Sequence, residues 1–257
     1  MKLAIAGKGG SGKTSISGTM ARLLARRGLR VLAIDGDSNP NLALTLGVPS
    51  EQWGSVPTLP RDLARRGENG IKLTKSVEEV RASHSLSGPD GTTLLVMAHP
   101  DPEEAGQGCL CGMHATVRTL IGELPDTDED VTILDTEASP EHLRRGTAKY
   151  ADVLVAVVEP YYKSLETGRR MAALAVELGL DQVFLLANKI RDDAEMDAVR
   201  EFAGAHDLDI VGVVPYDPGM EAAERARVSP LDHDPEMPFV RAIDDIAGRL
   251  VPVAAGR

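Results

Sequence analysis

Residues 7–14 read Gly-Lys-Gly-Gly-Ser-Gly-Lys-Thr, and this stretch decides how the rest of the chain is interpreted. It matches the pattern G-x-x-x-x-G-K-[ST], in which glycines let backbone N–H groups turn inward around phosphate oxygens. The stretch lies between an apolar run at 2–6 and a helix-length segment at 13–27, and the N-terminus of such a helix adds positive potential. We therefore predict a phosphate-binding loop; the alternative is a glycine-rich turn that binds nothing.

The residue types in this loop predict distinct contacts with a bound nucleotide and its metal ion. Lys13 is expected to reach the β- and γ-phosphates, and the Thr14 hydroxyl is expected to ligate Mg²⁺. Ser15 is expected to bond the α-phosphate. The residues expected to contact the nucleotide are Gly9, Gly10, Ser11, Gly12, Lys13, Thr14 and Ser15.

Short apolar runs alternate with helix-length segments along the chain. The runs are at 2–6, 30–34, 92–98, 131–134, 152–158, 182–187 and 210–214. The helix-length segments are at 13–27, 112–124, 140–149, 163–179, 194–205, 219–227 and 238–250. Such alternation indicates right-handed βαβ units and strands that are covered on both faces. We expect one α/β domain over 1–257, with a mostly parallel sheet of seven or eight strands flanked by helices on both faces.

Two segments depart from this alternation. Residues 48–91 are rich in Gly, Pro, Ser and charged residues, with weak helical patterns near 60–66 and 76–82. We interpret them as an insertion that covers the sheet edge or the site, not as a second domain. Residues 252–257 are expected to form a flexible tail.

The composition disfavours several classes of partner. Asp and Glu number 39 and Lys and Arg 28, so the formal net charge is −11, which argues against nonspecific nucleic-acid binding. The arginines at 22, 26, 27 and 30 are interpreted as a solvated helix face. No apolar run approaches the roughly 20 residues that span a bilayer, and the N-terminus lacks a signal pattern, so we expect a cytoplasmic protein that binds no membrane. Residues 238–250 carry two Asp and two Arg, which suits a docked last helix better than a lipid anchor.

Acidic side chains follow two of the predicted strands, at the edge where parallel sheets bind ligands. Asp35 and Asp37 follow the run at 30–34, and Asp135 directly follows the run at 131–134. Asp135 is expected to hold Mg²⁺, directly or through water, as the aspartate at this position does in phosphoryl-transfer sites. Asp37 lies where the phosphates of a nucleotide are expected; the alternative is a helix cap or an Asx turn.

The only cysteines, Cys109 and Cys111, are two residues apart in Gly-Cys-Leu-Cys-Gly. A C-x-C pair closes too tight a ring for a comfortable disulfide, and two thiolates supply half of a tetrahedral metal site. A two-fold homodimer would bring two such pairs together at its axis. We predict a shared Ni²⁺ or Zn²⁺ site, to which Met113 or His114 could add a ligand. One alternative is that the thiols are simply buried as small apolar groups. Another is a redox dithiol, for which C-x-x-C would be the expected spacing.

The phosphate loop also resembles that of a particular class of ATPases. Residues 8–14 are similar to the deviant Walker A motif K-G-G-x-G-K-[ST] of the class that contains MinD, ParA and the nitrogenase iron protein. The resemblance implies an ATP-bridged homodimer, in which Lys8 reaches the partner's nucleotide. It also implies that Asp37 orients or deprotonates the attacking water. Lys8, Lys13 and Asp37 are therefore the expected catalytic residues.

The end of the run at 182–187 resembles the base-recognition loop of P-loop nucleotide-binding proteins. Guanine-specific members have Asn-Lys-x-Asp there, whereas this chain has Asn188, Lys189 and, in the fourth position, Arg191, which cannot accept a hydrogen bond. We therefore expect adenine rather than guanine, with Asn188 bonding its edge. The other side of the base pocket is expected from Pro215, Tyr216 and Asp217.

Within this class, the chain resembles the CooC-type ATPases, which assist nickel insertion into carbon monoxide dehydrogenase. The resemblance rests on the single C-x-C motif upstream of Asp135 and on residues 135–146, which are similar to D-x-E-A-G-x-E-H-x-x-R-G. Ser139 stands where that type often has glycine. The nitrogenase iron protein has a cysteine just after the aspartate, and this chain has none there, so its iron–sulfur cluster is not expected.

The resemblance implies a Mg²⁺-dependent ATPase that uses ATP and ADP and binds a metal at paired C-x-C motifs. Nickel is favoured by the resemblance, and the residues themselves leave the choice between Ni²⁺ and Zn²⁺ open. It implies a homodimer whose client is an apo-metalloenzyme such as carbon monoxide dehydrogenase. Two alternatives stay open at this point. One is a partitioning or positioning ATPase like ParA or MinD, and the other is an ATP-dependent regulatory switch that uses no metal.

Overall fold

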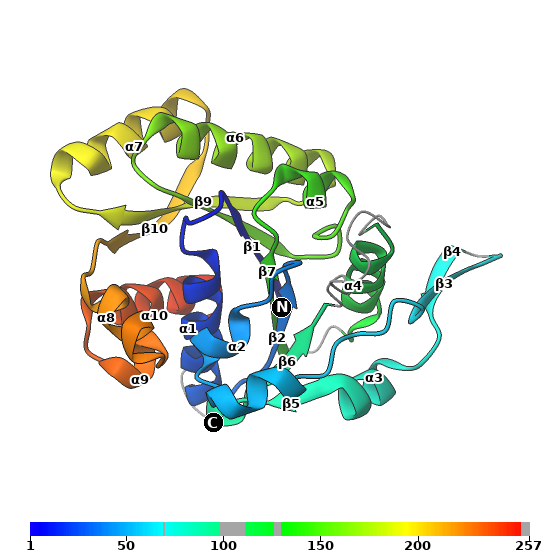
Figure 1. Ribbon diagram of the computed structural model, residues 1–257. Helices are drawn as coiled ribbons and strands as arrows, with labels where there is room; N and C mark the ends of the chain where they lie inside the picture. The colour runs from blue at the N-terminus through cyan, green and yellow to red at the C-terminus, as the bar shows by residue number, and fades with distance from the viewer. Residues whose placement is uncertain (69, 98–110, 126–129, 253–257) are drawn as a thin grey trace.

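A sheet that is covered by helices on both faces forms the centre of the molecule (Figure 1). The computed structural model describes all residues except 69, 98–110, 126–129 and 253–257. Within that part of the chain the sheet has eight strands in the order β10-β9-β8-β1-β7-β2-β6-β5, and all neighbours are parallel except β5 and β6. The strands are β1 Lys2–Gly7, β2 Arg30–Gly36, β5 Ser85–Ser87, β6 Thr93–Val96, β7 Asp130–Thr136, β8 Val153–Val158, β9 Gln182–Ile190 and β10 Asp209–Pro215.

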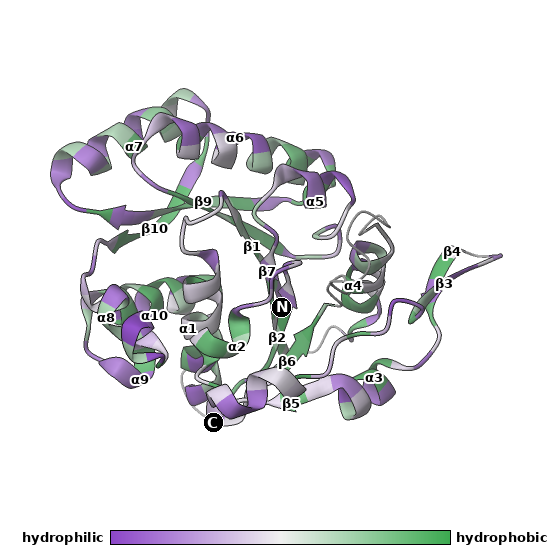
Figure 2. Ribbon diagram, in the orientation of Figure 1, coloured by the Kyte–Doolittle hydropathy of each residue, from purple (hydrophilic) through white to green (hydrophobic). Residues whose placement is uncertain are grey.

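The helices divide into two layers because successive strand residues point to opposite faces. In β1, Leu3 and Ile5 contact one layer, while Ala4 and Ala6 contact the other. The first layer holds α1 Lys13–Arg26, α2 Leu42–Leu46, α8 Gly219–Ala226, α9 Pro230–His233 and α10 Pro238–Leu250. The second holds α3 Val77–His84, α4 Cys111–Glu123, α5 Pro140–Arg144, α6 Tyr162–Glu177 and α7 Asp193–Ala205. The central strands are accordingly hydrophobic on both faces (Figure 2).

The predicted α/β fold with a mostly parallel sheet is confirmed. Each of the seven predicted strands is present, and so is a helix in each predicted segment. The eighth strand, β5, was not predicted, because it has three residues and lies within 48–91. The helix predicted over 140–149 ends earlier, at Arg144, because Gly146 adopts the left-handed conformation (φ 72°) that ends helices.

The segment 48–91 lies along the β6 edge of the sheet and contributes to its core. The N–H of Leu59 donates to the carbonyl of Val96 at 2.8 Å, and Leu59, Leu63, Val77 and Val80 are buried in the second layer. The segment also contains the short 3₁₀ helices Ser50–Ser55 and Pro89–Gly91. The chain therefore uses this segment to cover one edge of the parallel sheet.

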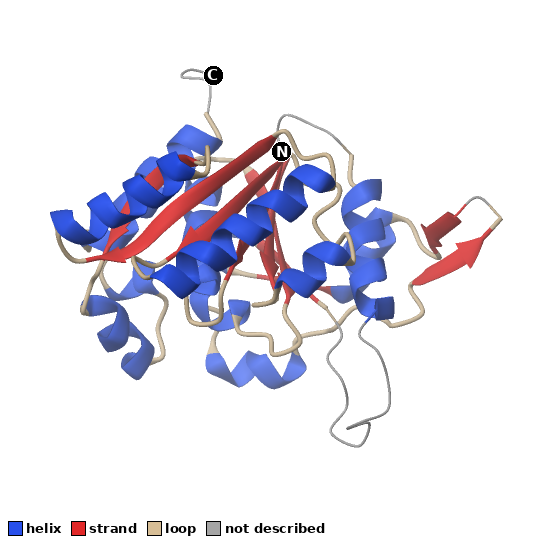
Figure 3. Ribbon diagram, turned by 90° about the horizontal axis from the view of Figure 1, so that it is seen from above, coloured by secondary structure: helices blue, strands red, loops and turns tan. Residues whose placement is uncertain are grey.

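The helix indicated near 60–66 is wrong, whereas the one near 76–82 is α3. Residues Ala64–Gly67 form β3, which pairs antiparallel with β4 (Gly70–Leu73) in a hairpin that extends away from the body (Figures 1 and 3). Leu59 and Leu63 are four residues apart and both anchor this segment to the core, although neither lies in a helix. Helix α3 begins at a capping box, in which Ser76 and Glu79 bond each other's backbone N–H.

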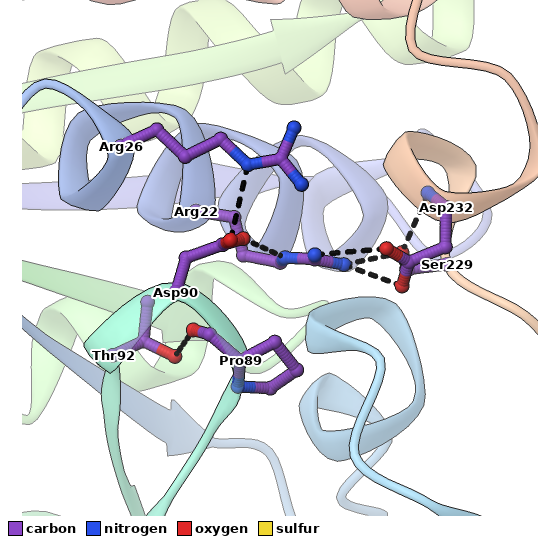
Figure 4. A network of polar contacts seen from close by, with 7 residues as sticks. All are labelled: Arg22, Arg26, Pro89, Asp90, Thr92, Ser229 and Asp232. Atoms are coloured by element: carbon purple, nitrogen blue, oxygen red, sulfur yellow. Dashed lines mark hydrogen bonds and ion pairs between the residues drawn. The ribbon is translucent and has the colours of Figure 1, made fainter.

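The expectation of a solvated arginine face is also wrong for Arg22, whereas Arg26 and Arg30 are exposed. Arg22 is 3% exposed and donates to Asp90 at 2.6 Å, to Asp232 at 2.8 Å and to Ser229 at 2.8 Å (Figure 4). Arg26 contacts Asp90 at 3.1 Å. The helical spacing of the arginines can be seen in the sequence, but their acidic partners cannot. Asp90 comes from the 3₁₀ helix Pro89–Gly91, and Asp232 comes from α9. This cluster ties the segment 48–91 and the C-terminal helices to α1.

Helix α10 docks on the body, as its sequence predicts. Its apolar residues Phe239, Val240, Ile243, Ile246 and Leu250 are buried in the first layer. Arg27 of α1 donates to the backbone carbonyl and the carboxylate of Asp244, at 2.7 and 2.6 Å. Among the described residues, no helix combines the length and the apolar character that crossing a membrane would need.

We expect Arg22→Met to lower the free energy of unfolding by about 2–4 kcal/mol, because it leaves Asp90 and Asp232 without their shared counter-charge. Urea denaturation measures this value. The matched variant Arg26→Met removes a side chain that is 43% exposed, and it should cost less than about 1 kcal/mol. Equal losses for the two variants would contradict the structural role given to Arg22.

Candidate nucleotide-binding site

The phosphate loop connects β1 to α1, and its conformation requires glycine at two positions. Gly10 and Gly12 adopt left-handed φ values of 79° and 96°. A Cβ atom on Gly12 would lie 2.5 Å from the side-chain nitrogen of Asn188, so the site excludes any larger residue. Helix α1 begins directly after Gly12, which directs its N-terminal N–H groups toward the loop. The fold thus presents the loop as an anion-binding site at a helix N-terminus.

Lys13 is buried beneath the loop, close to two carboxylates. Its side chain is 6% exposed and donates to the backbone carbonyl of Lys8 at 3.3 Å. Burial lowers the pKa of Lys13, and the charges of Asp135 and Asp37 act in the opposite direction. The loop therefore holds a desolvated ammonium group whose main support is the acidic pair.

Asp135 ends its β-strand inside the molecule, next to the first turn of α1. It is 1% exposed, Ser17 Oγ donates to it at 3.2 Å, and the Thr14 hydroxyl also bonds it. Burial and the neighbouring Asp35 raise its pKa to about 7, against the effect of these hydrogen bonds and of Lys13. A hydroxyl and a buried carboxylate are the oxygen donors that Mg²⁺ prefers, so Thr14 and Asp135 fit this ion.

The loop after β2 is organised by Asp35. Its carboxylate accepts from the N–H groups of Asp37 at 3.2 Å, Asn41 at 2.9 Å and Leu42 at 2.8 Å, and burial raises its pKa to about 6. Asp37 is half-buried and accepts from the N–H of Asn39 at 2.9 Å, which is an Asx turn. The charge of Asp37 nevertheless acts to raise the pKa of Lys13. Asp37 can therefore form the Asx turn and also lie beside the phosphate-binding loop.

Lys8 lies on the outer side of the loop and does not point at its own phosphate cradle. Its Nζ donates to Tyr161 Oη at 3.3 Å and lies 5.2 Å from the centre of the Tyr161 ring. Tyr161 precedes α6 and is 41% exposed, and Tyr162 beside it is 72% exposed. Lys8 is thus held at the surface, from where it can reach a second molecule.

The carboxyl end of β9 supports the phosphate loop. The Asn188 side-chain nitrogen donates to the Ser11 carbonyl at 2.7 Å. Lys189, whose φ is 61°, donates to the Gly10 carbonyl at 2.6 Å and pairs with Glu159 at 2.6 Å. Lys189 and Glu159 are not among the residues expected at the site. The Asn-Lys pair is a signal for Lys189, but Glu159 comes from another strand end and no local pattern marks it.

The residues after β10 contribute unequally to the expected base pocket. The Asp217 carboxylate accepts from the N–H groups of Gly219 at 2.9 Å and Phe239 at 3.1 Å. It therefore connects the first turns of α8 and α10. Tyr216 follows Pro215 and is 39% exposed. The guanidinium carbon of Arg191 lies 4.5 Å from the centre of the Tyr216 ring. An exposed aromatic face that can contact a base therefore comes from Tyr216.

The expected thiolate site lies at the start of α4. Cys109 is outside the described residues, and Cys111 begins α4. Met113 is buried in the core, and His114 is 1% exposed between Thr147 and Glu137. Within the part of the chain that the structure describes, no three His, Cys, Asp or Glu side chains form a metal-binding group.

The sequence matches the family described as "CobQ/CobB/MinD/ParA nucleotide binding domain" over residues 2–229. The chain belongs to this family. Membership accounts for the phosphate loop between β1 and α1, and it makes the chain a nucleotide-binding protein of the P-loop ATPase class.

Individual proteins similar to this chain include a CooC protein, an uncharacterised ATP-binding protein and a MinD protein. The carbon monoxide dehydrogenase accessory protein CooC of Rhodospirillum rubrum is 34% identical over 244 residues, which cover 91% of each chain. An uncharacterised ATP-binding protein of Methanocaldococcus jannaschii is 38% identical over 231 residues, covering 84% of this chain and 86% of that one. The septum site-determining protein MinD of Pyrococcus horikoshii, complexed with Mg-ADP, has the same fold: its TM-score is 0.69 at 19% identity, covering 99% and 97% of the two chains. The predicted resemblance to CooC-type ATPases within the MinD and ParA class is confirmed.

We expect Lys189→Met to raise the Kd for Mg-ATP about tenfold, because it releases the Gly10 carbonyl that Lys189 holds. Hydrogen bonds to charged groups contribute about 1.5 kcal/mol, which corresponds to this factor. Isothermal titration measures the Kd, and Arg200→Met, which removes an exposed pair with Asp197, is the control. An unchanged Kd would show that Lys189 does not shape the loop.

Proposed function

We propose that this protein is a Mg²⁺-dependent ATPase that forms a nucleotide-bridged homodimer and carries nickel at paired C-x-C motifs for metallocentre assembly. One observation carries the proposal: the loop that contains Lys8 and the C-x-C motif occur in a chain that is 34% identical to CooC over 91% of both sequences. The fold supports nucleotide binding, and the rest is inferred from these two motifs together.

In the proposed reaction, the loop N–H groups and Lys13 bind the phosphates, and Thr14 and Asp135 hold Mg²⁺. Bound there, Mg²⁺ would offset the negative charge that develops on the phosphate oxygens. Asp37 orients the attacking water, and Lys8 of one subunit leaves Tyr161 and reaches the nucleotide of the other. Catalysis of this kind depends mainly on positioning and charge stabilisation, which a buried Lys13 and a rigid loop can supply.

The dimer explains how two cysteines suffice for a metal site. Cys109 and Cys111 provide two thiolates, and a two-fold axis supplies two more, which completes a four-sulfur site. Nickel and zinc both accept such ligands, and we propose nickel because of the relation to CooC. The client is then an apo-metalloenzyme such as carbon monoxide dehydrogenase, and the compartment is the cytoplasm, where thiols stay reduced.

We expect Lys8→Ala to reduce ATP turnover at least about 100-fold while the Kd for Mg-ATP changes less than about threefold. The reason is that a charge which stabilises the transition state from the partner contributes mainly to turnover. Phosphate release and isothermal titration measure the two quantities. Lys163→Ala, which removes an exposed lysine at the start of α6, is the control. Normal hydrolysis by Lys8→Ala would rule out the role of Lys8 in the partner's site.

We expect the reduced protein to bind one Ni²⁺ per two chains and the double variant Cys109→Ser/Cys111→Ser to bind none. Thiolates must lose protons to bind the metal, so uptake should weaken as the pH falls. Equilibrium dialysis with Ni²⁺ and with Zn²⁺, with and without ATP, measures the stoichiometry. Cysteine-independent binding, or none in either nucleotide state, would remove metal delivery and favour a metal-free switch or a ParA-like ATPase.

A further inference from the structure

Helix α4 meets the loop that follows β7 through the buried side chain of His114. This residue lies three positions after Cys111, so it is about one helical turn from the start of the helix. Its ring is 1% exposed, and both of its nitrogens face polar groups. The side chain therefore points into the molecule, toward the loops that follow β2 and β7.

The group that meets His114 from the nucleotide side is Glu137. One carboxylate oxygen of Glu137 accepts from Ser38 Oγ at 3.2 Å, and the other lies 3.4 Å from His114 Nε2. Ser38 directly follows Asp37, and Glu137 comes two residues after Asp135. One carboxylate thus joins three segments, namely the loop after β2, the loop after β7 and the first turn of α4.

On its other side, His114 is held by Thr147. Thr147 Oγ1 lies 3.3 Å from His114 Nδ1 and donates to the carbonyl of His142 at 2.9 Å. His142 is itself 1% exposed, and neither ring nitrogen makes a hydrogen bond of good geometry among the described residues, although the backbone of Ser139 and Glu137 lies close enough to act on its pKa. Burial lowers its pKa to about 3, so the second imidazole is neutral.

Packing alone does not explain this polar cluster. Buried polar groups cost free energy unless they are fully bonded, and apolar side chains would fill the same space at lower cost. His142 leaves two buried nitrogens unbonded, so the cluster is incompletely satisfied in this arrangement. A cluster of this kind can rearrange when a neighbouring loop moves, because the alternative arrangement has hydrogen bonds to gain.

We propose that Glu137 and His114 are positioning residues that couple the nucleotide state to helix α4, and hence to the cysteine motif at its start. The inference deepens the proposed function and rests on it where it concerns the metal. A nucleotide that binds between the loops of Asp37 and Asp135 moves Ser38 and Glu137, and Glu137 carries His114 with it. The coupling can be no larger than the difference in the nucleotide's affinity for the two arrangements of the loops.

The first experiment follows amide hydrogen exchange in α4 and needs no metal. In the wild type, exchange of the amides of Gly112–Arg118 should differ about fivefold or more between Mg-ADP and a non-hydrolysable Mg-ATP analogue. Glu137→Ala should abolish the difference, and Glu137→Gln should restore part of it, because its single amide oxygen can still accept from one of the two partners, Ser38 or His114. The matched control is Glu141→Ala, which removes an exposed carboxylate from the same segment and should leave the difference intact.

Ser38→Ala examines the same connection from the other loop and deletes only one hydroxyl, so its effect does not depend on the folding of the Glu137 variants. It should reduce the nucleotide-dependent difference in α4 exchange at unchanged Mg-ADP affinity. The proposal is overturned if the wild type shows no difference in α4 between the two nucleotides. It is also overturned if Glu137→Ala and Ser38→Ala both keep the full difference.

The second experiment measures linkage with Ni²⁺ as the probe. In the wild type, the ATP analogue should change the Kd for Ni²⁺ by a factor within the usual range of about 5 to 150, and Ni²⁺ should change the Kd for the analogue by the same factor. Glu137→Ala should bring both factors close to one while the stoichiometry of one Ni²⁺ per two chains remains. Loss of Ni²⁺ binding in His114→Asn would make His114 a metal ligand and would overturn its role as a positioning residue.

The two proposals fail in different ways. If the wild type binds no Ni²⁺ yet α4 responds to nucleotide through Glu137, the proposed cargo is wrong and the coupling stands. If Ni²⁺ binds with the expected stoichiometry and α4 responds equally in Glu137→Ala, the coupling is wrong and the cargo stands.

Discussion

The structure depends on the conformation of one glycine loop, which must turn its N–H groups inward at the point where a parallel strand meets a helix. Gly12 can take its left-handed conformation only without a Cβ atom, since the Asn188 side chain fills that space. Asn188 and Lys189 in turn hold carbonyls of the loop. The loop is therefore rigid because β1 and β9, which are far apart in the sequence, end at the same edge of the sheet.

The charges around this loop are arranged for a ligand. Asp35 and Asp135 are both 1% exposed, and Lys13 lies between the loop and the acidic groups. Burial raises the pKa values of both aspartates and lowers that of Lys13, which favours the neutral form of each group. A bound phosphate would favour the charged form of Lys13, and a bound divalent cation would favour the charged form of the aspartates. Asp35 has a structural role, because its carboxylate accepts hydrogen bonds from backbone N–H groups of the loop after β2.

The arginines of α1 and the segment 48–91 show where local patterns mislead. Helical periodicity assigns Arg22 to a solvent-facing surface, yet Asp90 and Asp232 approach it from elements that are distant in sequence and bury it. The pattern near 60–66 suggests a helix, yet Leu63 anchors a segment without helical structure to the core, and β3 begins directly after it. In each case a long-range contact overrides a local preference, and no window of sequence contains both partners.

The α/β fold, the phosphate loop and the order of strands and helices along the chain can be predicted from the sequence, because glycine geometry and apolar periodicity are local properties. The class of ATPase follows from the resemblance of residues 8–14 and 135–146 to the motifs of a known family. The tertiary structure was needed to find the further residues that surround the phosphate loop. It placed Lys8 on Tyr161, paired Lys189 with Glu159 and brought Ser38, Glu137 and His114 together. The physical reason is that parallel strands collect their carboxyl ends at one edge, so the site is assembled from turns separated by tens of residues.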